Sequence, residues 1–224
     1  MWKFEKIGKF FNKKVLVGLF FVLIFLIGGF FWWQRDRIKD FLEKEETEKM
    51  VALSEDYITV EDSNEKFIVN KKDGFKIKIP ESWKTEIGID MAGLTSERNV
   101  ILYSQDFNYR LQKGCLIEMQ INRLKEMRVE KYGEDIEMFP YEGVKEVRGI
   151  IDSYKSNEAK EGGEIILIDE TEALKETKIL KDGIGKYVSI KIPTENKVYI
   201  FNSVLFSDEC EEEFKQSLET VLIQ

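Results

Sequence analysis

The sequence contains no histidine, the side chain that most often serves as a general acid or base near neutral pH and most often ligates transition metals. This absence excludes every histidine-based catalytic triad and every histidine-containing zinc site. Catalysis without histidine could still use paired carboxylates or a serine with a lysine base, but no spacing among the 42 acidic residues singles out such a pair. We therefore assign no catalytic residue, no metal and no cofactor, and favour a protein that is not an enzyme.

Cysteine is almost as scarce, with Cys115 and Cys210 separated by 95 positions. That spacing excludes a Cys-x-x-Cys redox pair and a four-ligand zinc cluster. The remaining possibilities are that the two cysteines form a disulfide bridge or that both are buried thiols. An extracytoplasmic location would be oxidising, so we predict a bridge between Cys115 and Cys210.

Clustered positive charge is also lacking outside the N-terminus. The formal net charge is −8, and residues 1–33 carry five lysines and one glutamate, so the remainder is strongly acidic. Phosphate binding requires grouped lysine and arginine, which argues against a nucleic acid partner. The acidic groups at 134–137 and 211–213 lack the spacing of a calcium-binding loop and are interpreted as solvated faces.

One long hydrophobic run is present, at residues 15–33. These 19 residues contain no charge, and a helix of that length spans about 28 Å, close to the hydrocarbon thickness of a bilayer. The run ends in Phe30, Phe31, Trp32 and Trp33 instead of the small residues of a signal-peptidase site. Tryptophan suits the membrane interface, so we predict an uncleaved transmembrane helix that contacts the lipid bilayer.

The flanks of this run bear on its orientation. Residues 1–14 and residues 34–49 each carry five lysine or arginine residues, so positive charge alone gives a tie. The downstream flank also contains six acids, and a basic segment followed by an apolar run is the usual order of an export signal. We therefore predict a basic cytoplasmic stub at 1–14 and a C-terminal domain outside the cell membrane.

Residues 34–56 contain neither glycine nor proline and carry oppositely charged pairs four positions apart. This pattern favours an exposed helical stalk. Its apolar positions do not persist as heptads, which argues against a coiled coil. An extracytoplasmic α+β domain is then predicted over residues 57–224.

Alternating apolar and polar residues predict strands in this domain, and Asp73-Gly74 marks a turn. The stretch at 197–206 is apolar on both faces, which places it at the centre of a sheet. Short turns between consecutive strands indicate an antiparallel meander. The predicted strands are 57–60, 66–69, 75–79, 99–103, 115–121, 164–168, 175–180, 186–192 and 197–206.

Two helices are predicted. Residues 141–154 have apolar side chains every three to four positions and follow Pro140, a suitable residue for a helix start. The C-terminal helix begins near Ser207 or Asp208, which can cap it, and its buried stripe contains Cys210, Phe214, Leu218 and Val221.

Two short stretches resemble a known family. Gly74-Phe75, an alternating strand, Pro80 and Trp83 resemble the opening of PsbP-like domains, and KYVSIKIPTENKVYIFNSVLF followed by a helix resembles their closing part. The resemblance covers about residues 57–224. It implies an antiparallel sheet flanked by helices, a PsbP-like α/β/α sandwich, and a noncatalytic role in binding or stabilising a partner complex. Because histidine is absent, no histidine metal site of the family is carried over.

The predicted function is a single-pass, membrane-anchored binding or assembly module with an envelope protein partner. Phe107, Tyr109 and Arg110 form a candidate partner-binding loop, since these residue types are enriched in interfaces. A carboxylate-dependent hydrolase of the cell envelope is one alternative. A pilin-like envelope subunit is another, disfavoured because no Gly-Phe processing site followed by a helical glutamate is present.

Overall fold

The computed structural model describes residues 22–23, 29, 50–89, 95–132, 136–156, 163–180 and 183–223. The chain divides into two compact units, residues 1–47 and residues 48–224. The predicted stub, the stalk up to residue 49 and most of the predicted membrane span lie outside the described residues. Within the span, Val22, Leu23 and Gly29 are helical and exposed. A helix long and apolar enough to cross a bilayer is not found among the described residues.

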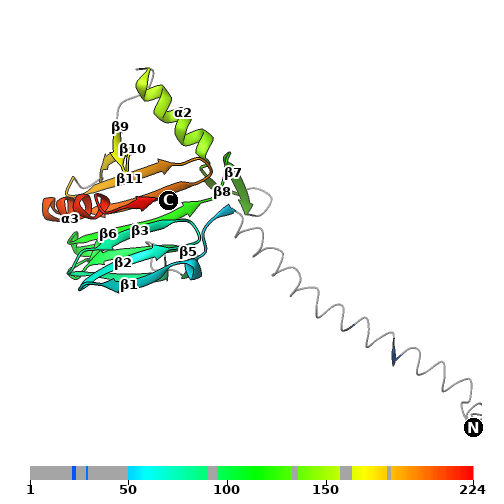
Figure 1. Ribbon diagram of the computed structural model, residues 1–224, viewed down its shortest axis with the longest axis horizontal. Coiled ribbons are helices and arrows are strands. Elements are labelled where there is room, and N and C mark those ends of the chain that lie inside the picture. The colour runs from blue at the N-terminus through cyan, green and yellow to red at the C-terminus, as the bar shows by residue number, and fades with distance from the viewer. Residues whose placement is uncertain are drawn as a thin grey trace, which may run out of the picture. The chain divides into compact units, whose positions relative to one another are not determined.

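The second unit is built around an antiparallel sheet of seven strands (Figure 1). Four consecutive strands, β9 to β12, form the predicted meander, and β6 pairs with the far side of β12. The strand order, with bounds, is β4 (Trp83–Ile89), β5 (Thr95–Ser104), β6 (Cys115–Asn122), β12 (Val198–Leu205), β11 (Lys186–Pro193), β10 (Thr171–Ile179) and β9 (Gly163–Ile168).

Strand β12 occupies the centre of this sheet, as its apolar sequence predicts. Val198 and Ile200 belong to a small core beneath one helix. Tyr199 and Phe201 belong to the larger core on the opposite face. A strand buried on both faces cannot alternate between polar and apolar residues, which explains its composition.

A second sheet packs on that opposite face. It has the order β1 (Ile58–Asp62), β2 (Glu65–Asn70), β3 (Phe75–Ile79) and β13 (Leu222–Ile223). The ring of Phe75 lies 5.7 Å from that of Tyr199 and 6.0 Å from that of Phe201. Phe75, Ile77 and Ile79 are buried on one face of β3, which agrees with the alternating pattern that predicts this strand. The antiparallel α+β class is thus confirmed, but the strands are divided among several sheets instead of one.

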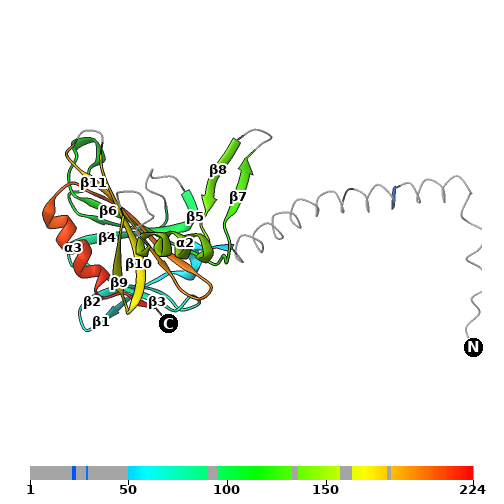
Figure 2. The same cartoon turned by 90° about the horizontal axis from the view of Figure 1, so that it is seen from above.

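The two long helices lie on opposite faces of the seven-stranded sheet. Helix α2 (Val144–Lys155) packs over β9, β10 and β11, whereas α3 (Asp208–Leu218) packs beside β3 and β12 (Figure 2). The predicted stripe of α3 is buried, and Ser207 accepts a hydrogen bond from the Cys210 amide. Helices therefore flank the sheet, in agreement with the predicted arrangement.

The start of α2 differs from the prediction. Residues 136–141 form β8 (Ile136–Tyr141), which pairs with β7 (Arg128–Tyr132), so Pro140 belongs to a strand. Helix α2 begins after Gly143, whose amide donates to the Glu146 carboxylate at 3.1 Å. Pro140 lies at an irregular point of the ladder, where a missing amide is tolerated.

The end of the predicted stalk also differs. Met50, Val51, Ala52 and Leu53 are buried, and Val51 forms a β-bridge with Asn122 at the end of β6. A short 3₁₀ turn, η1 (Ser54–Asp56), then leads into β1. The domain therefore begins before residue 57, because this apolar run is part of its core.

Candidate functional site

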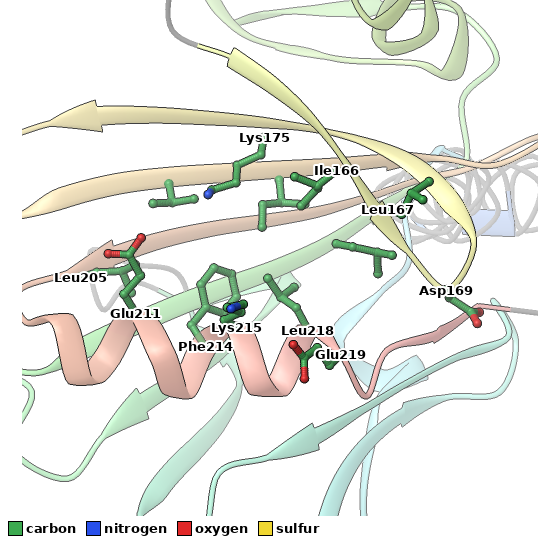
Figure 3. A pocket seen from close by; sticks show the side chains of 13 residues that line it. Ile166, Leu167, Asp169, Lys175, Leu205, Glu211, Phe214, Lys215, Leu218 and Glu219 are labelled. Carbon is green, nitrogen blue, oxygen red and sulfur yellow. The ribbon is translucent and has the colours of Figure 1, made fainter.

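An apolar groove lies between α3 and the β9–β11 part of the large sheet (Figure 3). Its cavity volume is about 420 Å³. The floor is formed by sheet residues and the wall by the inner side of α3. The apolar lining residues are Ile166, Leu167, Ile168, Val188, Ile190, Leu205, Phe214 and Leu218.

The β9–β10 hairpin forms the outer border of the groove. Asp169 and Glu170 form its two-residue turn, and both have left-handed backbone angles, with φ of 47° and 60°. Such a turn matches the natural twist of the strands. The Asp169 carboxylate accepts a hydrogen bond from the Ile223 amide at 2.7 Å, so the hairpin tip is held against the C-terminal strand.

The rim of the groove carries both signs of charge. Lys175 forms an ion pair with Glu164 at 2.6 Å, and Lys186 pairs with Glu211 at 2.6 Å. The hydrogen bond that Lys186 donates to the Glu211 carboxylate raises the pKa of Lys186 above its ordinary value. Figure 3 shows Lys215 and Glu219 on α3 beside the apolar floor. An apolar floor with a charged rim is the usual composition of a protein-binding surface.

A disulfide joins Cys115 on β6 to Cys210 on α3, which confirms the predicted pair. Their Cα atoms are 5.8 Å apart, within the range that a disulfide requires. Both residues are buried in the main core. The bridge fixes the first turn of α3, the wall of the groove, to the large sheet.

The predicted partner-binding loop lies between β5 and β6 and contains a short turn, η2 (Tyr109–Leu111). Phe107 is half-buried and packs near Tyr103, with 6.5 Å between ring centroids. Tyr109 is 62 % exposed although its ring lies 5.9 Å from that of Phe206, and Arg110 is exposed. Tyr109 and Arg110 are therefore exposed to solvent, whereas the ring of Phe107 is half-buried against Tyr103.

A β-bridge between Asn108 and Lys113 closes this loop. Gly114 follows with φ of 71°, and a side chain there would lie 2.4 Å from the Ser104 hydroxyl. The bridge and the close packing at Gly114 restrict the path of the loop. It contributes nothing to the lining of the groove, so the structure gives two separate candidate surfaces.

A partly buried ionic cluster, centred on the buried Asp73, lies between the two sheets. The Arg123 guanidinium donates to both oxygens of Asp73, at 2.8 and 2.6 Å, and to Asp56 at 3.0 Å. Lys197 lies 3.4 Å from the Asp73 carboxylate. The Tyr199 hydroxyl donates to the Asp73 carbonyl oxygen at 2.6 Å. Sequence patterns gave no indication of this cluster, because Asp73 and Arg123 are far apart along the chain.

The charges of this cluster compensate one another. Burial raises the pKa of Asp73, but hydrogen bonding and attraction from Arg123 outweigh burial and hold that pKa below its ordinary value. Burial raises the pKa of Tyr199 to about 12. A carboxylate that is ionised and accepts hydrogen bonds at both oxygens is suited to a structural role and poorly suited to donating a proton.

On the α2 side of the large sheet, a polar hollow contains Lys191. This side chain lies 2.8 Å from Glu142 and 3.2 Å from Glu176. Burial lowers its pKa, yet the two carboxylates raise it above the ordinary value overall. The lysine is therefore held as a cation in a bridge between β11, β10 and the start of α2.

No group of three or more potential metal ligands occurs in the described part of the chain. Gly183 and Gly185 lie in the turn between β10 and β11, and the Leu180 amide donates to the Gly185 carbonyl at 2.9 Å. A phosphate-binding loop would instead lead from a strand into a helix.

Comparisons with known proteins give distant likenesses. No family model and no curated protein matches the chain. A crystal structure from Bacteroides thetaiotaomicron VPI-5482 has a TM-score of 0.37 and 13 % identity; the match covers 67 % of this chain but only 45 % of that one. The solution structure of cyanobacterial PsbP (CyanoP) from Synechocystis sp. PCC 6803 has a TM-score of 0.39 and 11 % identity, covering 75 % of this chain and 93 % of that one.

One of these two structures is named as a PsbP protein, the family that two stretches of the sequence resemble. At these TM-scores and identities the likeness is too distant to carry a functional assignment. The groove could not be predicted from the sequence because its lining residues are of the types found in an ordinary hydrophobic core. Its existence depends on how far α3 lies from β9, which no local pattern encodes.

Proposed function

We propose that this chain is a noncatalytic, membrane-anchored binding module whose C-terminal domain holds an apolar segment of an envelope protein partner. Residues 15–33 form the anchor in this proposal, with residues 1–14 in the cytoplasm and the domain outside. The observation that carries the proposal is the groove between α3 and β9–β11, with its apolar floor and charged rim.

The volume and composition of the groove support this role. A space of about 420 Å³ lies within the range of known ligand-binding clefts. Ile166 is half-buried at the edge of the floor. Covering such side chains removes apolar surface from water, at about 25 cal/mol per Å². A partner with apolar side chains therefore gains free energy from filling the groove.

The test is crosslinking in intact cells followed by mass spectrometry of the proteins joined to the domain. The informative variant is Ile166→Asp, which places a charge on the groove face of β9. The matched control is Ile165→Asp on the other face of the same strand, where Ile165 is also half-buried and packs toward α2. We expect Ile166→Asp to reduce recovery of one envelope partner by at least about fivefold, a free-energy change of roughly 1 kcal/mol.

The control variant should retain that partner. Circular dichroism of both variants would verify that they fold equally well. A chain that stays without a partner, or two variants that lose the partner equally, would contradict a binding role for the groove.

A further inference from the structure

Strand β9 has an unpaired outer edge among the strands that the structure describes. It pairs with β10 in a regular register, from Gly163 opposite Glu176 to Ile168 opposite Thr171. The residues beside a two-residue hairpin turn form a hydrogen-bonded pair, so Ile168 and Ile166 direct their main-chain groups toward β10. The amides and carbonyls of Ile165 and Leu167 therefore point outward, where another strand can bond to them.

The other described edges are protected in ways that β9 lacks. Strand β4 has a register shift between Ile87 and Ile89 and lies beside the η1 turn. Strand β1 ends in two acidic residues and β13 has only two residues. Strand β8 contains Pro140, and β7 carries three charges in five residues. Charge, proline, irregularity and shortness are the usual means of preventing edge-to-edge pairing.

By contrast, β9 has the sequence GEIILI, with neither proline nor a register shift. Its single charge, Glu164, is compensated by Lys175 on the neighbouring strand at 2.6 Å. Leu167 is 72 % exposed. A regular, apolar edge of six residues is a template for strand addition.

We propose that β9 pairs antiparallel with β9 of a second copy of this chain, about a two-fold axis through Ile166. Because the same edge is used by both copies, the assembly closes as a dimer and continues no further. The two large sheets would then form one continuous sheet across the axis.

The sequence of β9 is complementary to itself in this register. Leu167 of one copy lies opposite Ile165 of the other, which covers the most exposed apolar side chain of the strand. Ile166 lies opposite its own copy, and Glu164 lies opposite Ile168. No two like charges lie opposite each other in this register. Such a pair would oppose pairing. A register centred on Ile165 would place Leu167 opposite Gly163 and leave it uncovered.

This inference does not rest on the proposed function, because it concerns the main-chain edge of β9 and not the filling of the groove. The first experiment is sedimentation equilibrium of the full chain in density-matched detergent. We expect a reversible dimer whose dissociation constant rises at least about tenfold in Leu167→Lys, since an edge lysine opposes pairing. The matched control is Ile179→Lys, which changes a side chain that is 74 % exposed at the end of β10. This control should change the constant less than about twofold.

The second experiment determines the register. In the proposed pairing the two copies of residue 166 face each other with Cβ atoms about 5 Å apart, so Ile166→Cys should form an intermolecular disulfide on mild oxidation. Peptide mapping would verify that Cys115 remains bonded to Cys210. A monomer at every concentration, equal effects of the two lysine variants, or crosslinking by Ile165→Cys in place of Ile166→Cys would overturn the proposal.

Discussion

Asp73 combines two roles at the scale of a single residue. With Gly74 it forms the turn that its sequence predicts, and its side chain, 1 % exposed, is also the centre of the ionic cluster. A turn dipeptide is recognised from neighbouring residues alone. The partnership with Arg123 depends on the packing of two sheets, so it could not be predicted.

This cluster leads to a prediction about acid stability. The pKa of Asp73 is lower in the folded chain than in the unfolded chain, so the group stabilises the fold at neutral pH and loses that effect as pH falls from about 4 through its folded pKa. Asp73→Asn should lower the free energy of unfolding at pH 7 by about 3 kcal/mol, because Arg123 loses its buried partner.

Urea unfolding at a series of pH values, from 7 down to below about 4, would measure how Asp73→Asn changes the free energy of unfolding. The variant should lose less stability on acidification than the unchanged chain. Glu195→Gln, in an exposed turn, is the control and should follow the unchanged chain. Identical pH profiles for all three would show that Asp73 contributes no ionic stabilisation.

Single buried residues were the most predictable part of the molecule. Phe75, Ile77 and Ile79 follow the period of two, and Trp83 is buried at the start of β4. The loop residues Phe107, Tyr109 and Arg110 were selected by residue type, and the structure separates them into one partly packed ring and two exposed side chains. Residue type alone does not reveal which aromatic ring finds a neighbour within its own domain.

At the scale of elements, the N-terminus of α3 depends on Ser207. Its hydroxyl accepts a hydrogen bond from the Cys210 amide at 3.2 Å. Ser207→Ala should lower the free energy of unfolding by about 1 kcal/mol, because the amide loses its partner. Ser207→Asp can cap the helix equally well and should remain within a few tenths of a kcal/mol of the unchanged chain. Chemical unfolding of the three chains would test this, and equal losses in both variants would exclude capping as the cause.

The disulfide should stabilise the domain substantially. Closing a loop of 95 residues restricts the unfolded chain and is worth about 4.7 kcal/mol in the chain-entropy model. We therefore expect reductant to lower the urea midpoint of the unchanged chain. A variant with both Cys115→Ala and Cys210→Ala should unfold at lower urea and be insensitive to reductant. An unchanged midpoint after verified reduction would show that packing alone holds α3.

Elements joined by short turns were predictable, and elements joined by distant pairing were not. The β9–β12 meander follows from alternation and turn residues, with bounds that differ by a few residues. Strand β4 was missed because Thr85 occupies an apolar position of its alternation and Gly88 is unfavourable inside a strand. Strand β13 was missed because two residues are too few to show an alternating pattern. Its partner β3 also lies at the other end of the domain sequence.

At the scale of the whole molecule, the proposed topology can be tested with protease. If the domain lies outside the cell membrane, protease added to intact spheroplasts should degrade it and leave a protected N-terminal fragment. A second sample lysed with detergent controls for intrinsic resistance of the fold. Protection in intact spheroplasts together with cleavage after lysis would contradict the orientation and remove the oxidising environment that favours the disulfide.

The attachment of residues 50–52 to β6 has a mechanical consequence. The Ala52 amide donates to the Ile121 carbonyl at 2.8 Å and the Arg123 amide donates to the Met50 carbonyl at 2.6 Å, both at the end of β6. At its beginning, β6 is joined covalently to α3 through Cys115. Tension on the chain ahead of residue 50 would therefore act along β6 and pass through a covalent bond to the wall of the groove. Strand β6 thus links residues 50–52 to the wall of the groove, and it is the path by which such a force would reach α3.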